Sequence, residues 1–134
     1  MNIDEYDDLA DGLDKSDLVD VYEVFFREAA EEPEAVTLRK LDILCDKQWH
    51  TSELPDKEIQ KQVRELIMSH WDESSSFLEL VLGVCYCFGL DKELFCKSLS
   101  LYDGEFKDEF VSHLENSKGD NVDPYWSMRG GAAK

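Results

Sequence analysis

FLELVLGVCYCFGL, residues 77–90, is the most hydrophobic stretch of this 134-residue chain. Eleven of its fourteen residues are apolar or aromatic, and only Glu79, Gly83 and Gly89 interrupt them. A segment that is apolar on every side is expected to be buried on every side, as a central helix or a core strand. It is too short to cross a bilayer, which needs about 20 apolar residues. We predict a central buried helix; its valine and aromatic content also suits a strand over residues 80–88.

Amphipathic patterns on both sides of this segment predict further helices. Apolar residues recur at intervals of three and four, as on one face of a helix. The turns between these patterns are short, so we predict an all-α fold in which antiparallel helical hairpins surround the central helix. Residues 1–134 are expected to form a single helical domain, with residues 1–15 as either a short helix or a flexible acidic arm. The predicted hairpins cover residues 16–45, 56–90 and 91–117.

Capping residues predict where several helices begin and end. Ser16 can cap the first long helix, and Ser76 with Glu79 fits a capping box at the start of the central helix. Gly89 suits the left-handed conformation that often ends a helix. The segment KQWHTSELP, residues 47–55, breaks the helical pattern and is expected to be a loop.

The charge of the chain is strongly negative and unevenly distributed. The formal net charge is −17, and residues 1–34 hold thirteen acidic residues against only two basic ones, Lys15 and Arg27. Nucleic acids and anionic membrane surfaces both require cationic patches on a protein. The composition therefore argues against direct binding of either, and favours a basic protein partner.

Cysteines and histidines give no sign of a catalytic or metal site. Cys85 and Cys87 lie in the most apolar segment with no histidine nearby, so we expect buried free thiols in a reducing cytoplasm. The three histidines are dispersed, and no nucleotide-binding, nucleophile-elbow or zinc-protease motif occurs. The first residues lack the basic and apolar regions of a secretory signal. We predict a cytoplasmic binding protein that is not an enzyme and needs no metal and no cofactor.

The segment DPYWSMRGGAA, residues 123–133, resembles the second half of a HEAT-type repeat. Its aspartate and proline, its methionine and arginine, and its two alanines fall at the matching offsets. In such repeats the aspartate caps the helix, the hydrophobic residue enters the core and the alanines allow close packing. The two glycines depart from the pattern and are expected to weaken this helix by about 1 kcal/mol each relative to alanine.

Residues 77–115 are similar to helical, HEAT-like immunity proteins of bacterial toxin systems, such as contact-dependent inhibition or polymorphic toxin systems. The similarity lies in the order of an apolar helix, CYCFGLDKE, a short helix and GEFKDEFVSHLEN before an Asp-Pro helix start. It implies an immunity protein that binds and neutralises a basic toxin domain, such as a nuclease, by blocking its active site. Dense carboxylates would speed the encounter with such a partner. The residues predicted to contact it are Asp4, Glu5, Asp7, Asp8, Asp11, Asp14, Asp17, Asp20, Trp49, Glu53 and Asp56.

Two other functions fit the same residues. A HEAT-like adaptor without inhibitory role would bind a protein or peptide in a concave groove lined by Trp49, Tyr125 or Trp126. An enzyme of an unrecognised helical class would require His50 and His70 to meet with acidic residues in one cleft. The acidic run could also serve only to keep the protein soluble.

Overall fold

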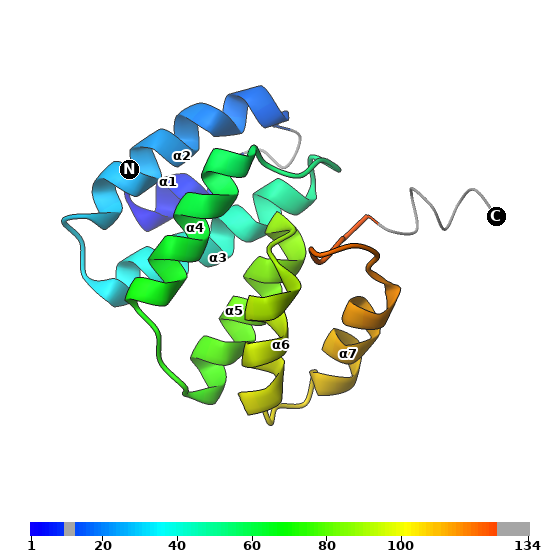
Figure 1. Ribbon diagram of the computed structural model, residues 1–134. Helices are drawn as coiled ribbons and strands as arrows, with labels where there is room; N and C mark the ends of the chain where they lie inside the picture. The colour runs from blue at the N-terminus through cyan, green and yellow to red at the C-terminus, as the bar shows by residue number, and fades with distance from the viewer. Residues whose placement is uncertain (10–12, 126–134) are drawn as a thin grey trace.

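The computed structural model describes residues 1–9 and 13–125, and within them the chain is all-helical, as predicted (Figure 1). No strand forms in this part of the chain; a single β-bridge joins Asp91 and Asn121. None of the described helices has the length and hydrophobicity needed to cross a bilayer. The helices are α1 (Ile3–Asp7), α2 (Lys15–Ala29), α3 (Glu34–Trp49), α4 (Lys57–Ser69), α5 (Ser75–Phe88), α6 (Lys92–Leu101) and α7 (Lys107–Asn116).

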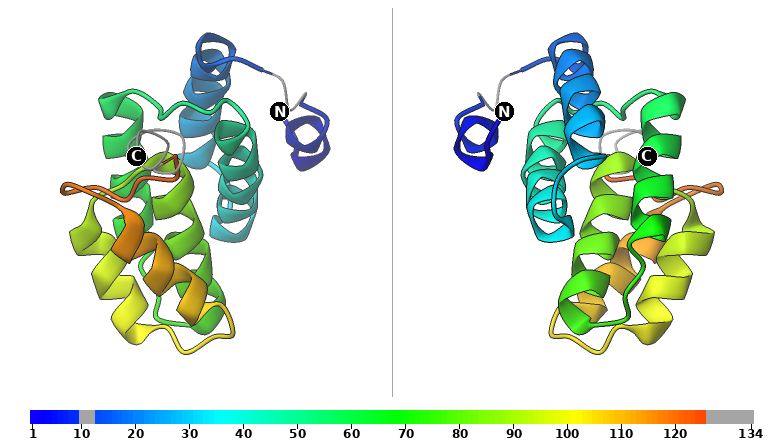
Figure 2. Two further views of the ribbon diagram at one scale, coloured as in Figure 1. Left: turned by 90° about the vertical axis from the view of Figure 1, so that its right-hand side faces the viewer. Right: turned by 90° about the vertical axis from the view of Figure 1, so that its left-hand side faces the viewer.

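Helix α5 lies in the middle of the molecule, with α3 on one side and α6 on the other (Figures 1 and 2). Its most extensive packing is with these two helices rather than with α4, which precedes it in the chain. Seven of its side chains are buried, among them the fully enclosed Val81, Val84 and Phe88. The central helix is therefore confirmed, but the hairpin expected over residues 56–90 is not a close helix pair.

We expected α5 to be buried on every side, but one face of the helix is only partly buried. Glu79, Leu80, Gly83, Tyr86 and Cys87 are only half-buried. Their spacing of three and four residues places them on a single face of the helix. This face lies between α3 and α7, and α7 itself buries no side chain completely. A hydrophobic sequence was thus a sufficient sign of a central position, but not of complete enclosure.

Two predicted helix starts are displaced by two residues. Helix α2 is capped by Asp14, whose Oδ1 accepts the backbone N–H of Asp17 at 2.9 Å, so Ser16 lies inside the first turn. Helix α5 is capped by Ser74, whose Oγ accepts the N–H of Phe77, and the expected capping box at Ser76 does not form. In both places two neighbouring residues can cap, and the one further upstream does so.

The end of α5 follows the prediction. Gly89 has φ +66° and ψ +41°, the left-handed conformation that only glycine adopts without strain. A Cβ atom at this position would stand 2.7 Å from Cδ2 of Leu54, so any other residue would also have to displace the Leu54 side chain. The left-handed backbone at Gly89 is what ends the helix.

Helix α3 continues to Trp49, so the loop predicted to begin at residue 47 begins later. Gln48 is fully buried, and its position continues the inner stripe of Leu41, Leu44 and Cys45. Its Oε1 accepts the hydroxyl proton of Tyr22 at 2.6 Å, and its Nε2 donates to backbone and side-chain oxygens of the following loop. These hydrogen bonds satisfy a polar side chain inside the core and tie α2, α3 and the loop together.

The N-terminal residues form a docked helix. Tyr6 of α1 is completely buried, and α1 packs against α3. Lys40 of α3 is also completely buried; its Nζ donates to Glu32 at 2.6 Å, to Glu28 at 3.2 Å and to the Met1 carbonyl at 2.8 Å. The amino group of Met1 and the hydroxyl of Tyr6 contact the same Glu28 carboxylate. We call Met1, Tyr6, Glu28, Glu32 and Lys40 the Lys40 network.

The C-terminal prediction falls largely outside the described residues. Asp123 accepts the backbone N–H of Tyr125 at 2.9 Å, in keeping with a capping role. The methionine, arginine and alanines of the HEAT-like motif lie beyond residue 125, as does Trp126, and Asp11 lies in the other undescribed segment. A HEAT-like arrangement therefore stays a prediction.

Candidate functional site

A groove between α2 and α4 collects several of the residues expected to bind a partner. It consists of two adjoining clefts of about 470 and 410 Å³, which share Val19 and Asp56. We call it the acidic groove. Its lining residues are Asp14, Lys15, Ser16, Val19, Tyr22, Glu23, Phe26, Arg27, Glu53, Asp56, Glu58, Ile59 and Gln62.

The floor of the acidic groove is apolar because α2 carries a second hydrophobic stripe. Its first stripe, Leu18, Tyr22 and Phe25, faces the core and is buried. Val19 and Phe26, one residue further along each turn, are half-buried and line the groove with Ile59 of α4. An apolar centre surrounded by a polar rim is the arrangement found at protein–protein interfaces.

Carboxylates dominate the rim. Asp14, Glu23, Glu53, Asp56 and Glu58 oppose only two cations, Lys15 and Arg27. Lys15 already pairs with Asp56, at 3.0 Å between Nζ and Oδ1. The hydrogen bond from the backbone of Asp17 holds the pKa of Asp14 below its usual range, so this carboxyl stays ionised at neutral pH. The groove is therefore complementary to a cationic surface with an apolar centre.

Three of the predicted contact residues come together in this groove, namely Asp14, Glu53 and Asp56. Asp14 is far from the other two in the sequence, and the start of α2 and the loop before α4 bring all three to one cleft. Asp17 and Asp20 are exposed on α2 but do not line it.

The remaining predicted contact residues lie elsewhere. Helix α1, with its exposed Asp4, Glu5, Asp7 and Asp8, is separated from α4 by α2 and α3 (Figure 2). Trp49 ends α3 with 44% of its surface exposed and its ring edge-on to that of His50. The acids of the first third thus occupy at least two separate surfaces.

Among the described residues proposed for the other two functions, Trp49 and Tyr125 do not form an open groove, and His50 and His70 do not share a cleft. Tyr125 is buried, and its hydroxyl donates to the backbone oxygens of Gln48 and Trp49, so it cannot line an open groove. His50 follows the last residue of α3, whereas His70 lies 4.0 Å from Glu34 at the first. Fifteen helical rises of about 1.5 Å place these two ends about 22 Å apart.

The third histidine and the cysteines also have packing explanations. His113 of α7 stacks on Tyr86 of α5 at 4.0 Å between ring centroids, and burial lowers its pKa. Burial likewise raises the pKa of the Cys85 thiol and disfavours the reactive thiolate. Within residues 1–9 and 13–125, no three His, Cys, Asp or Glu side chains converge as a metal site would require.

The apolar floor of the acidic groove was not identified from the sequence. Val19, Glu23 and Phe26 follow each other at intervals of four and three, which indicates a common helix face. This signal was overlooked because the stronger stripe of Leu18, Tyr22 and Phe25 accounts for the core. A helix with two adjacent apolar stripes either packs against two neighbours or leaves one stripe for a partner.

Comparisons with protein-family models, curated proteins and solved structures find no match to this chain. Its function is therefore inferred from its own residues.

Proposed function

We propose that this protein is an immunity protein that binds a basic toxin domain, such as a nuclease, through the acidic groove. The observation that carries this proposal is an apolar floor of Val19, Phe26 and Ile59 surrounded by five carboxylates. A nuclease binds phosphates in a cationic cleft. A rim of fixed carboxylates can occupy the same cleft and exclude the substrate without any chemical step.

The two parts of the groove would contribute differently to binding. The carboxylates, in the field of a chain of net charge −17, would accelerate the encounter with a cationic domain and orient it. The apolar floor would supply most of the affinity, because desolvated central contacts dominate binding energies. Block of the toxin then requires both a fast approach and a slow release.

The test begins with the reading frames beside this one: we expect one of them to encode a cationic toxin domain, which is then purified and assayed with the wild-type protein. We expect stoichiometric inhibition, with an affinity that falls by at least about tenfold between 50 and 300 mM salt, as electrostatic association demands. An affinity that does not change with salt would contradict the electrostatic component.

A charge-matched pair of variants locates the surface. The groove variant carries Glu23→Lys, Glu53→Lys and Glu58→Lys, which leave the helix cap Asp14 and the Lys15 partner Asp56 intact. The control carries the same change of net charge on α1, as Asp4→Lys, Asp7→Lys and Asp8→Lys. We expect the groove variant to weaken binding at least about 100-fold and the control by about threefold or less, because close charge pairs couple more strongly than distant ones. Equal losses would show that only net charge matters.

A further inference from the structure

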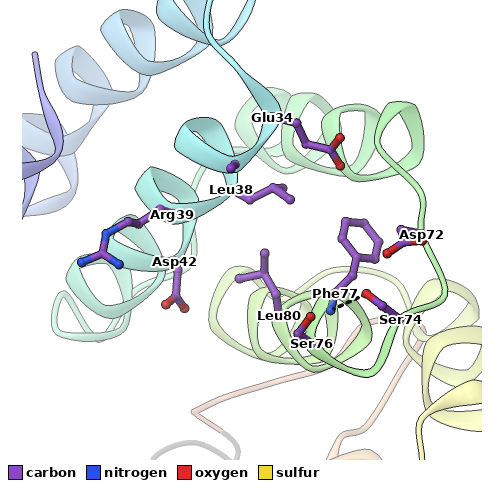
Figure 3. Close-up of a pocket in the computed structure, with 10 residues that line it drawn as sticks. Glu34, Leu38, Arg39, Asp42, Asp72, Ser74, Ser76, Phe77 and Leu80 are labelled. Carbon is purple, nitrogen blue, oxygen red and sulfur yellow. Dashed lines mark hydrogen bonds between the residues drawn. The ribbon is translucent and has the colours of Figure 1, made fainter.

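A second groove, between α3 and α5, shares no residue with the acidic groove (Figure 3). It consists of clefts of about 600 and 380 Å³ that share Asp42, Ser76 and Leu80, the smaller one reaching α7. In Figure 3, Leu38, Phe77 and Leu80 point into the gap between the two helices, whereas Arg39 extends away from it. We call this surface the α3–α5 groove.

Gly83 opens the floor of this groove. A glycine inside a helix costs about 0.5–1 kcal/mol relative to alanine. Here the cost has no packing reason within the described residues, since a Cβ atom at Gly83 would meet nothing within 4 Å. Gly89, by contrast, has both a positive φ and close neighbours. The missing side chain at Gly83 therefore leaves room for a group from outside.

The walls of the groove define the chemistry of that group. Its apolar lining comes from Leu38 of α3, Phe77 and Leu80 of α5, and Phe110 of α7. Carboxylates stand around this lining, and the single cation among the lining residues is Arg39, which points outward. Glu79 is held in place by the hydroxyl of Tyr102, at 3.1 Å. The acids that line the groove are Glu34, Asp42, Asp72 and Glu79.

We propose that the α3–α5 groove binds a cationic amphipathic helix of a partner protein. Helices recognised in grooves use apolar side chains at intervals of three and four residues as anchors. The distance from Glu34 to Asp42 along α3 is eight helical rises, about 12 Å, which matches slightly more than two turns of a bound helix. Such a helix would place one apolar anchor over Gly83 and its lysines or arginines against Glu34, Asp42, Asp72 and Glu79.

This second site goes beyond the proposed inhibition. A protein with two separate acidic surfaces could hold its toxin with one and a second cationic segment with the other. The space over Gly83, which would receive one apolar side chain of the bound helix, gives the α3–α5 groove its specificity. The acidic groove has no such space.

The experiment is selection from a phage-displayed library of helical 16-residue peptides, followed by affinity measurements on the synthetic peptides by fluorescence polarisation. We expect enrichment of peptides with apolar residues at helical spacing flanked by lysine or arginine. Gly83→Leu fills the groove and should weaken these peptides at least about 30-fold, the effect of losing one hot-spot contact. The groove variant at Glu23, Glu53 and Glu58 is a second control; because its charge changes lie away from the α3–α5 groove, it should bind these peptides within about threefold of the wild type.

The Gly83→Leu variant also reports on its own folding. Because its Cβ meets no atom and leucine is a better helix former, its melting temperature should equal or exceed that of the wild type. Enrichment of neutral or acidic peptides, or equal binding to Gly83→Leu, would overturn the proposal. So would a dimer in analytical ultracentrifugation that this variant disrupts, since a second copy would then be the occupant. The Gly83→Leu variant should still inhibit the toxin. The proposals for the two grooves can therefore be refuted independently of each other.

Discussion

Replacement of Lys40 by methionine tests whether the Lys40 network holds α1 on the domain. The side chain of Lys40 is completely buried, whereas its partners Glu28 and Glu32 keep 21% and 28% of their side-chain surface exposed. Loss of one member of a fully buried ion pair costs about 3–5 kcal/mol, and water can reach these two carboxylates, so we expect about 3 kcal/mol. Lys61→Met changes the net charge equally at an exposed position and is the control.

The assay is urea denaturation followed by circular dichroism. With a slope of about 1.5–2 kcal/mol per molar urea, a loss of about 3 kcal/mol lowers the midpoint by about 1.5–2 M. Lys61→Met should shift the midpoint by less than about 0.3 M, since exposed substitutions usually change stability by about 0.5 kcal/mol or less. If the two variants unfold within 0.5 kcal/mol of each other (about the spread of surface effects), the network contributes nothing measurable and the reasoning is refuted.

The same variant should change the dependence of stability on acid. Burial tends to raise the pKa of Glu28, but hydrogen bonds from Met1, Tyr6 and Lys40 outweigh it and lower the pKa from 4.5 to about 2. A carboxyl with a lowered pKa stabilises the fold above its unfolded pKa, and this stabilisation is lost as the pH falls from 4.5 towards 2. In Lys40→Met the loss over this interval should be smaller, which a series of melting temperatures at different pH values would measure.

Three further predictions concern the central helix and the thiols. Val84→Asp places an unpaired carboxylate at a fully buried position and should abolish the cooperative thermal transition, at a cost above about 4 kcal/mol; an intact transition would contradict the assignment of α5. Gly89→Ala should lower stability by about 1–2 kcal/mol because of its positive φ, whereas Gly83→Ala should raise it by about 0.5–1 kcal/mol, both measured by denaturation. Exposed Cys96 should react first with a thiol reagent, and equal rates for all cysteines would indicate an open core. The thiols expected to stay protected are Cys45 and Cys85.

The fold was predictable where one local rule decided the outcome. Helical periodicity was enough to predict that the chain is helical. The end of α5 at Gly89 was predictable because glycine is the residue best suited to its left-handed backbone. The first residues of the helices were harder to predict, because both Asp14 and Ser16 can cap α2 and both Ser74 and Ser76 can cap α5. The choice between two capable residues depends on local backbone geometry that the sequence pattern does not contain.

Buried polar residues were the main structural feature that the sequence concealed. Lys40 and Gln48 lie on the inner face of α3 at the spacing of the apolar stripe, but their side chains normally favour water. Each can be buried because partners outside its own helix satisfy it, Glu28 and Glu32 for Lys40 and Tyr22 for Gln48. A sequence pattern shows the helix face of such a residue but not the hydrogen bonds that make burial possible.

The candidate site was hidden for a related reason, because a count of charges does not separate the tasks that charges perform. Among the thirteen acids of residues 1–34, Glu28 neutralises a buried lysine and Asp14 caps a helix, while those of α1 lie apart from the acidic groove. Net charge therefore favours a cationic partner over an anionic one, but it does not indicate where a partner would bind. The apolar floor distinguishes one acidic surface from another, because carboxylates alone are equally well satisfied by water. A binding site on a highly acidic protein is better sought through partly exposed apolar residues that acids surround than through the densest run of acids.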